Sequence, residues 1–405
     1  MKILFYRYNS ICEPAIINAL TSFNIDVVQI MEDKGSTKDS AKNNIERVQK
    51  QIEEFRPDAV FSINFFPMLS KLCHIYGLIY IAQSVDCPVM ELFDKALLYD
   101  TNRIFLFDKA QYMMLHPYNP GCIFYLPLGS NPDQIAELLK DKPERGDLNP
   151  LAIAFVGSLY SEKNPYGQIK DKLSEHTKGF VDGLIQSQQS VYGYSFIEKT
   201  LPSNIAEEIH EYNPGFTGRY EDNCIMSVSK LRQFTAAHYF IEYELARKER
   251  FETLSALAKE FETDLYTNSD TDVFKDLSGS EGQNKLLIHT GVKTLTEMPV
   301  VFNNAKINLN MTLRAIETGL PLRIFDICAA GGFLMTNYQE ELPEYFEIGK
   351  EVEYYGSLDE LLDKCAYYLS HDDARSKIAS SGLERIKKQH TWKHRVAQII
   401  TSIWE

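Results

Sequence analysis

Short apolar segments that alternate with helical patterns constrain the fold of this chain more than any other feature. Residues 2–6 (KILFY) are typical of a buried strand, residues 14–23 place apolar side chains at helical spacing, and residues 25–30 (IDVVQI) are typical of a second strand. A strand, a helix and a strand within about 30 residues predict a parallel α/β sheet. Further strands are expected at residues 59–63, 78–82, 104–107 and 123–126.

The same alternation returns in the second half of the chain after a long interruption. A strand is expected at residues 151–156, whereas residues 165–237 contain helical patterns broken by Pro and Gly and predict a helical insertion. A long helix at residues 235–260 leads back to the alternation. Later strands are expected at residues 264–266, 286–289, 306–310 and 333–336, and helices at 323–330, 358–369, 373–389 and 394–404.

Together the two regions predict two facing α/β domains of the doubly wound, Rossmann-like type. We expect an N-terminal domain over residues 1–145, a C-terminal domain over residues 146–390, and a terminal helix over residues 391–405 that packs back on the first domain. The charged stretch at residues 140–150 (KDKPERGDLNP) is the expected linker, because it is rich in Pro and Gly. Ligands of such sheets bind beyond the carboxyl ends of the strands, so the site is expected in a cleft between the domains.

Charge and composition exclude several classes of protein. The 405 residues include 56 acidic and 42 basic side chains, a net charge of −14, whereas proteins that bind nucleic acid or anionic membranes are normally basic. The first ten residues (MKILFYRYNS) lack the apolar region and cleavage site typical of a signal peptide, and no run of about 18 apolar residues occurs, so a cytoplasmic location is expected. Seven cysteines without a C-x-x-C pair argue against a disulfide framework or a zinc site. A dinucleotide oxidoreductase is not expected, because no G-x-G-x-x-G follows the first strand.

The segment 318–336 (TGLPLRIFDICAAGGFLMT) carries the most chemical information. A Gly/Pro turn leads into a helix, on which Arg323 and Asp326 lie on neighbouring faces, and Gly331 with Gly332 permits close packing into the next strand. A helix N-terminus with an arginine suits a diphosphate, through backbone N–H groups, the helix dipole and the guanidinium. A carboxylate one turn later can accept both hydrogen bonds of a ribose diol. A surface ion pair between Arg323 and Asp326 is the alternative interpretation.

This segment resembles the donor-binding motif of retaining GT-B glycosyltransferases, in which Glu, seven residues and Glu are followed by a helix, a Gly turn and a strand. The two Glu positions fall on Thr318 and Asp326. The second is a conservative change with a shorter reach. The first is a departure, at a position where the family contacts a sugar hydroxyl.

A second segment, residues 155–165 (FVGSLYSEKNP), is similar to the loop that opens the C-terminal domain of that family. Gly157 and Lys163 fit the pattern, whereas Ser158 stands where the phosphate-binding arginine would be. The resemblance therefore leaves Arg314 or Arg323 to supply the missing charge.

A closer resemblance is to the bacterial group 1 glycosyltransferases that include the CgeB-like spore-maturation proteins. Residues 306–395 are similar to their C-terminal signature, and residues 61–73, 79–89 and 104–109 resemble their companion domain. This resemblance implies a GT-B fold and a hexosyltransferase-type enzyme that takes its sugar from a nucleotide-diphospho-sugar, retains the anomeric configuration and needs no metal or other obligatory cofactor. A UDP-sugar is the expected donor, since UDP is the commonest nucleotide in such donors, and a glycan, a protein or a small molecule is the expected acceptor.

Several polar side chains near predicted strand ends are candidates for the site. Asn308, Asn310 and Thr312 alternate along one strand and therefore share a face, which is either directed into the cleft or simply a polar outer face. Asp86 follows the fourth strand, where it either acts as a general base or orients an acceptor hydroxyl, or simply caps a turn before Pro88. Asn64 is a second acceptor candidate of the same status. Arg323 and Lys163 are expected to stabilise the leaving diphosphate. Donor contacts are expected at Gly157, Ser158, Tyr266, Asn268, His289, Asn310, Thr312, Arg314, Thr318, Gly319, Leu320 and Asp326.

Other classes of function stay open at this point. The departures at Ser158 and Thr318 favour a non-catalytic nucleotide-sugar-binding or scaffold protein on a decayed GT-B fold, and a sugar-nucleotide epimerase shares the fold and the donor. Residues 270–272 match the letters of a D-x-D metal motif, but they follow a strand in a polar loop, so no metal site is expected. The insertion is expected to form either an acceptor groove or a subunit contact in an oligomer.

Overall fold

The computed structural model describes residues 1–35, 38–140, 151–279 and 285–403. The linker expected at residues 140–150 lies outside these residues except for Lys140, and the expected domain limit at residue 145 stays a prediction for the same reason. The chain divides into two compact units. The first comprises Met1–Ser130, Asp222–Ile225 and His390–Glu405, and the second comprises Asn131–Glu221 and Met226–Gln389.

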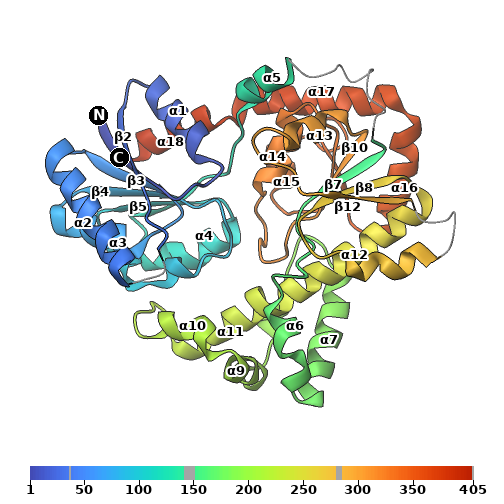
Figure 1. The fold of residues 1–405 in the computed structure, drawn as a ribbon, viewed down its shortest axis with the longest axis horizontal. Coiled ribbons are helices and arrows are strands. Elements are labelled where there is room, and N and C mark those ends of the chain that lie inside the picture. Colours follow the sequence, from blue (N-terminus) through green and yellow to red (C-terminus); the bar gives the residue numbers. More distant parts are fainter. Residues whose placement is uncertain (36–37, 141–150, 280–284, 404–405) are drawn as a thin grey trace. The chain divides into compact units, whose positions relative to one another are not determined.

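The first unit contains a parallel six-stranded sheet in the order β2-β1-β3-β4-β5-β6 (Figure 1). Its central strands are buried on both faces, as their continuous apolar sequences require. The strands are β1 (Lys2–Arg7), β2 (Asp26–Met31), β3 (Ala59–Ile63), β4 (Ile79–Gln83), β5 (Asn102–Leu106) and β6 (Ile123–Tyr125). All six agree with the sequence prediction to within two residues at each end. The strand order reverses between β1 and β3.

Helices cover this sheet, and one of them comes from far along the chain. The helices are α1 (Glu13–Ser22), α2 (Lys38–Phe55), α3 (Pro67–Tyr76), α4 (Lys109–Leu115) and α18 (Trp392–Ile403). The last of these, α18, packs against α1 through a buried face that includes Val396 and Ile399. Residues 222–225 also belong to this unit, where Lys95 N donates to Asn223 O at 2.9 Å and Ile225 N donates to Phe93 O at 2.8 Å.

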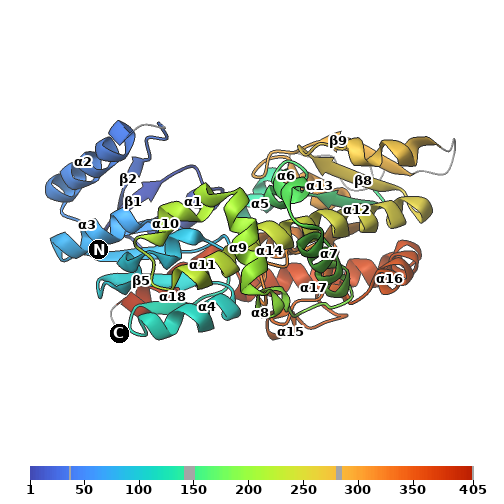
Figure 2. The ribbon, with the colours of Figure 1, turned by 90° about the horizontal axis from the view of Figure 1, so that it is seen from below.

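The second unit contains another parallel six-stranded sheet, in the order β12-β11-β10-β7-β8-β9. Figure 2 shows β8 and β9 side by side with a long helix along them. The strands are β7 (Ile153–Val156), β8 (Thr263–Thr267), β9 (Leu286–Thr290), β10 (Ile307–Asn310), β11 (Leu334–Asn337) and β12 (Glu353–Tyr355). The sequence predicts all of these except β12, which is three residues long and has no apolar alternation. The order reverses between β7 and β10, the first and fourth strands of this sheet.

Helices pack on both faces of the second sheet and on one another. They are α5 (Pro132–Lys140), α12 (Glu242–Glu260), α13 (Met298–Asn304), α14 (Leu322–Ala329), α15 (Leu342–Tyr345), α16 (Leu358–Ser370) and α17 (Asp372–Gln389). After α14 the chain turns sharply at Gly331, whose φ of +71° suits glycine. A Cβ atom at Gly332 would lie 2.7 Å from Phe302 O, so the predicted close packing is found at the second glycine of the pair.

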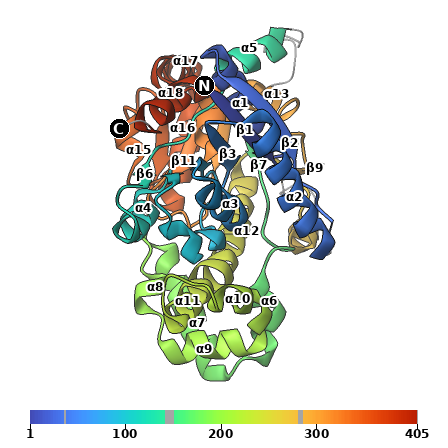
Figure 3. The ribbon, with the colours of Figure 1, turned by 90° about the vertical axis from the view of Figure 1, so that its left-hand side faces the viewer.

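The predicted helical insertion is present as a group of short helices with a core of its own. The helices gather around one end of α12 (Figure 3), which is preceded by a π-helical turn at Ala236–Ile241. They are α6 (Pro165–Ile169), α7 (Glu175–Gln189), α8 (Ile197–Thr200), α9 (Ser203–Tyr212), α10 (Pro214–Glu221) and α11 (Val228–Thr235). Among the helices of the described residues, none has the length and apolarity needed to cross a bilayer.

Candidate functional site

The point where the strand order of the second sheet reverses, between β7 and β10, is the natural place for a ligand in this unit. Helix α14 starts beside it, and Pro321, the residue before its first turn, makes no side-chain cap hydrogen bond. The half-buried Arg323 donates from Nη1 to Val156 O, the last carbonyl of β7, at 2.5 Å. Burial lowers the pKa of Arg323 to about 10, an effect that the carboxylate of Asp326 opposes and the charge of Arg250 strengthens. Arg323 therefore lies where an anion would be bound.

The loop after β7 is held by hydrogen bonds to the end of β8. Gly157 N donates to Tyr266 O at 3.1 Å, and Leu159 N donates to Ser269 Oγ at 2.8 Å. Ser158 Oγ donates to Glu162 Oε1 at 3.1 Å. Partial burial would raise the pKa of Glu162, but hydrogen bonds from its own backbone N–H and from two serine hydroxyls outweigh burial and lower it. The neighbouring Lys163 is exposed.

At the far edge of the sheet, the predicted nucleotide-binding residues on β8 and β9 contact each other. The rings of Tyr266 and His289 stack with centroids 4.5 Å apart and an interplanar angle of 16°. His289 Nε2 lies 2.7 Å from Asp264 Oδ1, and burial raises the pKa of Tyr266. Asn268 Oδ1 accepts a hydrogen bond from Gly291 N at 3.1 Å. One face of the tyrosine ring is thus occupied by the imidazole.

The alternating polar residues of β10 point into the protein. Asn308, Asn310 and Thr312 are all at most 5% exposed. Asn308 Nδ2 donates to Phe302 O at 2.9 Å, which gives it a structural role. Asn310 Nδ2 donates to Thr312 Oγ1 at 3.0 Å and to Thr336 Oγ1 at 2.9 Å. The shared face is real, but it is a buried hydrogen-bonded layer between β10 and β11.

Arg314 is a buried arginine with a carboxylate partner. Its Nη2 lies 2.6 Å from Glu249 Oε1, its Nη1 donates to Val191 O at 3.0 Å, and its guanidinium carbon lies 4.2 Å from the centroid of the Tyr192 ring. Burial would lower the pKa of Arg314, but the charge of Glu249 outweighs burial and raises it. Each nitrogen of this guanidinium therefore already has a hydrogen-bond partner within the protein.

The turn before α14 is held by the segment after β11. Thr318 Oγ1 donates to Glu341 Oε1 at 2.7 Å, and Gln339 Nε2 donates to Gly319 O at 3.0 Å. Leu320 is 2% exposed and forms part of the core. These contacts fix the backbone that leads into the N-terminus of α14.

In the first unit, the two predicted acceptor residues lie together at the ends of β3 and β4. Asn64 Nδ2 donates to Asp86 Oδ2 at 2.7 Å and to Tyr8 Oη at 2.9 Å. Asn64 Oδ1 accepts from Val85 N at 3.0 Å, and the backbone of Asn64 has φ +57°, which non-glycine residues seldom adopt. Burial and the charge of Asp86 raise the pKa of Tyr8. The exposed Asp86 is thus oriented beside the reversal of strand order in this sheet.

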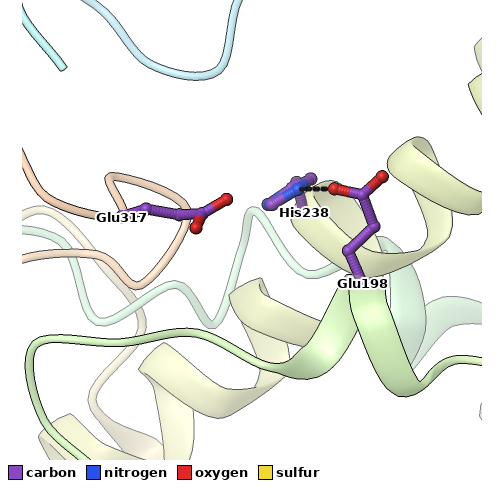
Figure 4. A group of neighbouring side chains, drawn as sticks. All are labelled: Glu198, His238 and Glu317. Atoms are coloured by element: carbon purple, nitrogen blue, oxygen red, sulfur yellow. Dashed lines mark hydrogen bonds and ion pairs between the residues drawn. The ribbon is translucent and has the colours of Figure 1, made fainter. Parts of the chain in front are cut away.

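A group of side chains from the insertion, the π-helical turn after it and the loop after β10 has the chemistry of a metal site. One ligand atom each of Glu198, His238 and Glu317 lies within 4.8 Å of the others, and the two glutamates flank the imidazole (Figure 4). His238 Nε2 lies 3.0 Å from Glu198 Oε2, and Nδ1 lies 2.7 Å from Glu242 Oε2. The imidazole therefore already bridges two carboxylates. Residues 270–272 form a local turn in which Asp272 N donates to Asp270 Oδ1 at 2.8 Å.

One residue at the reversal point is absent from the sequence prediction. Arg250 on α12 is 7% exposed, and its Nη2 donates to Met311 O, just after β10, at 2.8 Å. Its signal in the sequence is its spacing, because Ala246, Arg250 and Leu254 are four residues apart on the core face of the helix. A single charged residue among apolar residues at this spacing is the sequence signal that could have identified Arg250.

Comparison with known proteins gives a family-model match to part of the chain and a shared fold. Residues 251–401 match a family model described as glycosyl transferase-like. No curated protein sequence matches this chain.

Solved structures similar to this chain share its architecture over nearly its whole length. A glycosyltransferase from Rickettsia africae has 12% identity and a TM-score of 0.55, with 99% of this chain and 97% of that chain covered. Sucrose-phosphate synthase from Thermosynechococcus elongatus has 8% identity and a TM-score of 0.58, with 99% and 98% covered. Anabaena HepE in complex with UDP has 11% identity and a TM-score of 0.53, with 100% of both chains covered. With its two six-stranded parallel sheets and flanking helices, the chain has the GT-B fold, as the sequence predicts.

Proposed function

We propose that this protein is a glycosyltransferase that takes a sugar from a nucleotide-diphospho-sugar and transfers it to an acceptor. The observation that carries the proposal is the position of Arg323, at the first turn of α14 and at the end of β7, where the strand order reverses. The match of residues 251–401 to a glycosyl transferase-like family supports it, since it includes α14. The CgeB-like group 1 enzymes remain the subfamily that we propose.

The chemistry follows from the charge that develops on the leaving group. When the bond between the sugar and the diphosphate breaks, negative charge grows on the phosphate oxygens, and fixed donors stabilise it. Arg323, the N–H groups at the start of α14 and Lys163 are proposed to supply those donors without a metal ion. Asp326, one turn later, is proposed to accept hydrogen bonds from the ribose hydroxyls. Tyr266 with the stacked His289 is proposed to lie against the base.

A UDP-sugar is the donor that we propose. Anabaena HepE has been solved in complex with UDP and with UDP-glucose, and a trehalose-6-phosphate enzyme from Escherichia coli with UDP-2-fluoro glucose. Asp86, held by Asn64, is proposed to orient or deprotonate the attacking hydroxyl of the acceptor. We further propose that the product keeps the anomeric configuration of the donor.

The test is a panel of UDP-, GDP-, ADP-, CDP- and dTDP-sugars, first for binding by calorimetry and then for release of the nucleoside diphosphate. We expect one donor to bind, and Asp326→Ala to weaken its binding about tenfold because the ribose contacts are lost. Asp359→Ala, on the exposed start of α16, is the control and should bind like the wild type. If no donor binds, or if Asp326→Ala has no effect on binding, the proposal fails.

A second candidate function is non-catalytic binding of a nucleotide-sugar. It is favoured by the hydroxyls of Ser158 and Thr318, which stand at positions of charged residues in the resembling family and hydrogen-bond to Glu162 and Glu341. Turnover separates the two functions, because a binding protein would retain the donor without releasing nucleoside diphosphate. NMR of the product would identify an epimerase by a changed sugar on an intact nucleotide.

A further inference from the structure

Arg250 lies at the same reversal of strand order as Arg323, but it belongs to α12, whereas Arg323 belongs to α14. Its guanidinium carbon lies 4.4 Å from the centroid of the Tyr160 ring and 5.8 Å from that of Phe155, which is on β7. Its Nη2 donates to Met311 O at the end of β10. Arg323 Nη1 donates to Val156 O, and Val156 directly follows Phe155 on β7, so both guanidiniums lie at the end of the same strand.

The guanidinium of Arg250 is buried with most of its donors unused. Within the described residues, its Nε and Nη1 have no hydrogen-bond partner, and no carboxylate lies within 4.0 Å of it. Two arginines near it in sequence or space are paired: Arg247 with Glu244, and Arg314 with Glu249. A buried charge with free donors is costly, and groups of this kind in folded proteins normally have a partner such as a ligand.

We propose that Arg250 and Arg323 together form a two-arginine site for the diphosphate of the donor. In this site Arg250 supplies the cation that the resembling family carries at the position of Ser158. The inference rests on the proposed function for the identity of the ligand, but the site itself is a site for a diphosphate group. Two guanidiniums, held by different helices at the end of one strand, together offer donors for several oxygens of a diphosphate.

Tyr160 determines how the ligand reaches Arg250. Its ring lies on the guanidinium, its backbone N donates to Ser158 Oγ at 2.9 Å, and its φ is +60°. A tyrosine pays a conformational cost in this left-handed region, which a change of the loop would relieve. Binding of the diphosphate therefore involves displacement of the Tyr160 ring from Arg250, so that Nε and Nη1 can donate to the phosphate oxygens.

The experiment compares Arg250→Met with Arg250→Lys in the full chain. Calorimetry measures the affinity for UDP, GDP, ADP, CDP and dTDP, for the corresponding monophosphates and for inorganic pyrophosphate. We expect Arg250→Met to weaken binding of the diphosphate ligand tenfold or more, to weaken the monophosphate less, and Arg250→Lys to recover part of the loss. The control is Arg247→Met, one turn earlier on α12, which should bind as the wild type does.

The melting temperature separates a binding role from a structural one. We expect Arg250→Met to keep or raise it, because the variant removes a buried charge whose donors are unused. The proposal is overturned if Arg250→Met binds diphosphates within twofold of the wild type, or if it lowers the melting temperature and weakens all ligands equally. Failure of every ligand, pyrophosphate included, to bind the wild type overturns it as well. Binding of pyrophosphate that depends on Arg250, without binding of any nucleotide, would retain the anion site and refute the proposed function.

Discussion

The side chains around His238 show how a single residue can make stability depend on pH. Burial alone would lower the pKa of His238, but the carboxylates of Glu242 and Glu198 outweigh burial and raise it well above its usual value of 6.5. Glu317, from the loop after β10, is the further acidic group that faces it. Glu242 is itself held by Ser195, whose Oγ donates to Glu242 Oε1 at 2.7 Å. Protonated His238 is therefore the cation that balances this acidic group.

We predict that His238→Gln destabilises the protein most at low pH. Because the folded-state pKa is raised, the stabilisation by protonated His238 is fully present below the unfolded-state pKa of about 6.5 and declines as pH rises through the folded-state value. The difference in unfolding free energy between wild type and variant should shrink by about 1 kcal/mol or more between pH 6 and pH 9. Urea denaturation at several pH values measures it, with the exposed His371→Gln as control. A difference that stays constant with pH would contradict the prediction.

The arginines of the second unit also differ from one another in their hydrogen-bond partners. Arg314 and Arg247 have carboxylate partners, whereas Arg250 has none among the residues that the structure describes. Sequence spacing alone treats these arginines alike. The difference comes from which acidic residues the neighbouring segments bring to each guanidinium, and that is a property of the folded chain.

At the scale of elements, α17 lies unusually close to the backbone that precedes β12. A Cβ atom at Gly382, in the middle of α17, would lie 2.5 Å from Glu351 O and 3.6 Å from Cys328 Sγ on α14. Real Cβ atoms do not approach a carbonyl oxygen so closely, so the helix would have to shift. The glycine thus sets the spacing between α17 and the elements that carry Asp326.

We predict that Gly382→Ala lowers the unfolding free energy by about 1–3 kcal/mol, the usual cost of overpacking a well-packed contact. Gly179→Ala, at an exposed position of α7 with no atom within 4 Å of the added Cβ, is the matched control. It should raise stability by about 0.5–1 kcal/mol, because alanine is the better helix former. Thermal and urea unfolding of both variants measure the two effects. Equal effects of the two substitutions would be inconsistent with this account.

The strands and the helix at Arg323 could be predicted from the sequence because their signals are local. Apolar runs predict the strands of both sheets, and the Gly/Pro turn before Leu322 predicts the start of α14. The short β12 (EYY) is formed by pairing with β11, which no local pattern reveals. The direction of Asn308 and Asn310 could not be predicted either, since a period of two gives a shared face but not whether it is buried.

Motif comparison could not identify Arg250, which we propose to replace the arginine that the resembling family has at the position of Ser158, for a related reason. Arg250 comes from α12, far along the chain from the loop after β7, and only the fold brings the two segments together. The helical spacing of its apolar neighbours can be recognised in the sequence, but a charged residue on an apolar helix face does not by itself indicate a binding role. The observation that supports such a role is the position of the guanidinium, which lies against the Tyr160 ring and donates to Met311 O.

At the scale of the whole molecule, the first unit is built from three separate stretches of chain. Helix α18 packs its buried face against α1, and Arg395 Nε donates to Leu128 O at 2.9 Å. Ser130 N donates to His390 O at 3.0 Å, and Trp392 N donates to Ser130 O at 3.0 Å. The contribution of α18 to this unit therefore includes both apolar packing and backbone hydrogen bonds.

We predict that Ile399→Ala, on the buried face of α18, lowers the stability of the first unit by about 2–5 kcal/mol, because it leaves a cavity against the core. Hydrogen exchange measured by mass spectrometry should show faster exchange in β1 to β6 and little change in β7 to β12. The exposed Thr401→Ala on the same helix is the control. If exchange instead accelerates equally in both sheets, the two units unfold together and the prediction is wrong.

The return of the chain at residues 390–403 has a consequence for the order in which the protein acquires its structure during synthesis. Domains made first usually fold first as a chain leaves the ribosome. Here β1 to β6 are synthesised early, but the first unit is complete only after residues 222–225 and α18 have been made. The second unit, in contrast, has all its elements once α17 has been made. The unit translated first is thus the one finished last, and until then the surface of α1 that α18 will cover is open to chaperones and to misplaced partners.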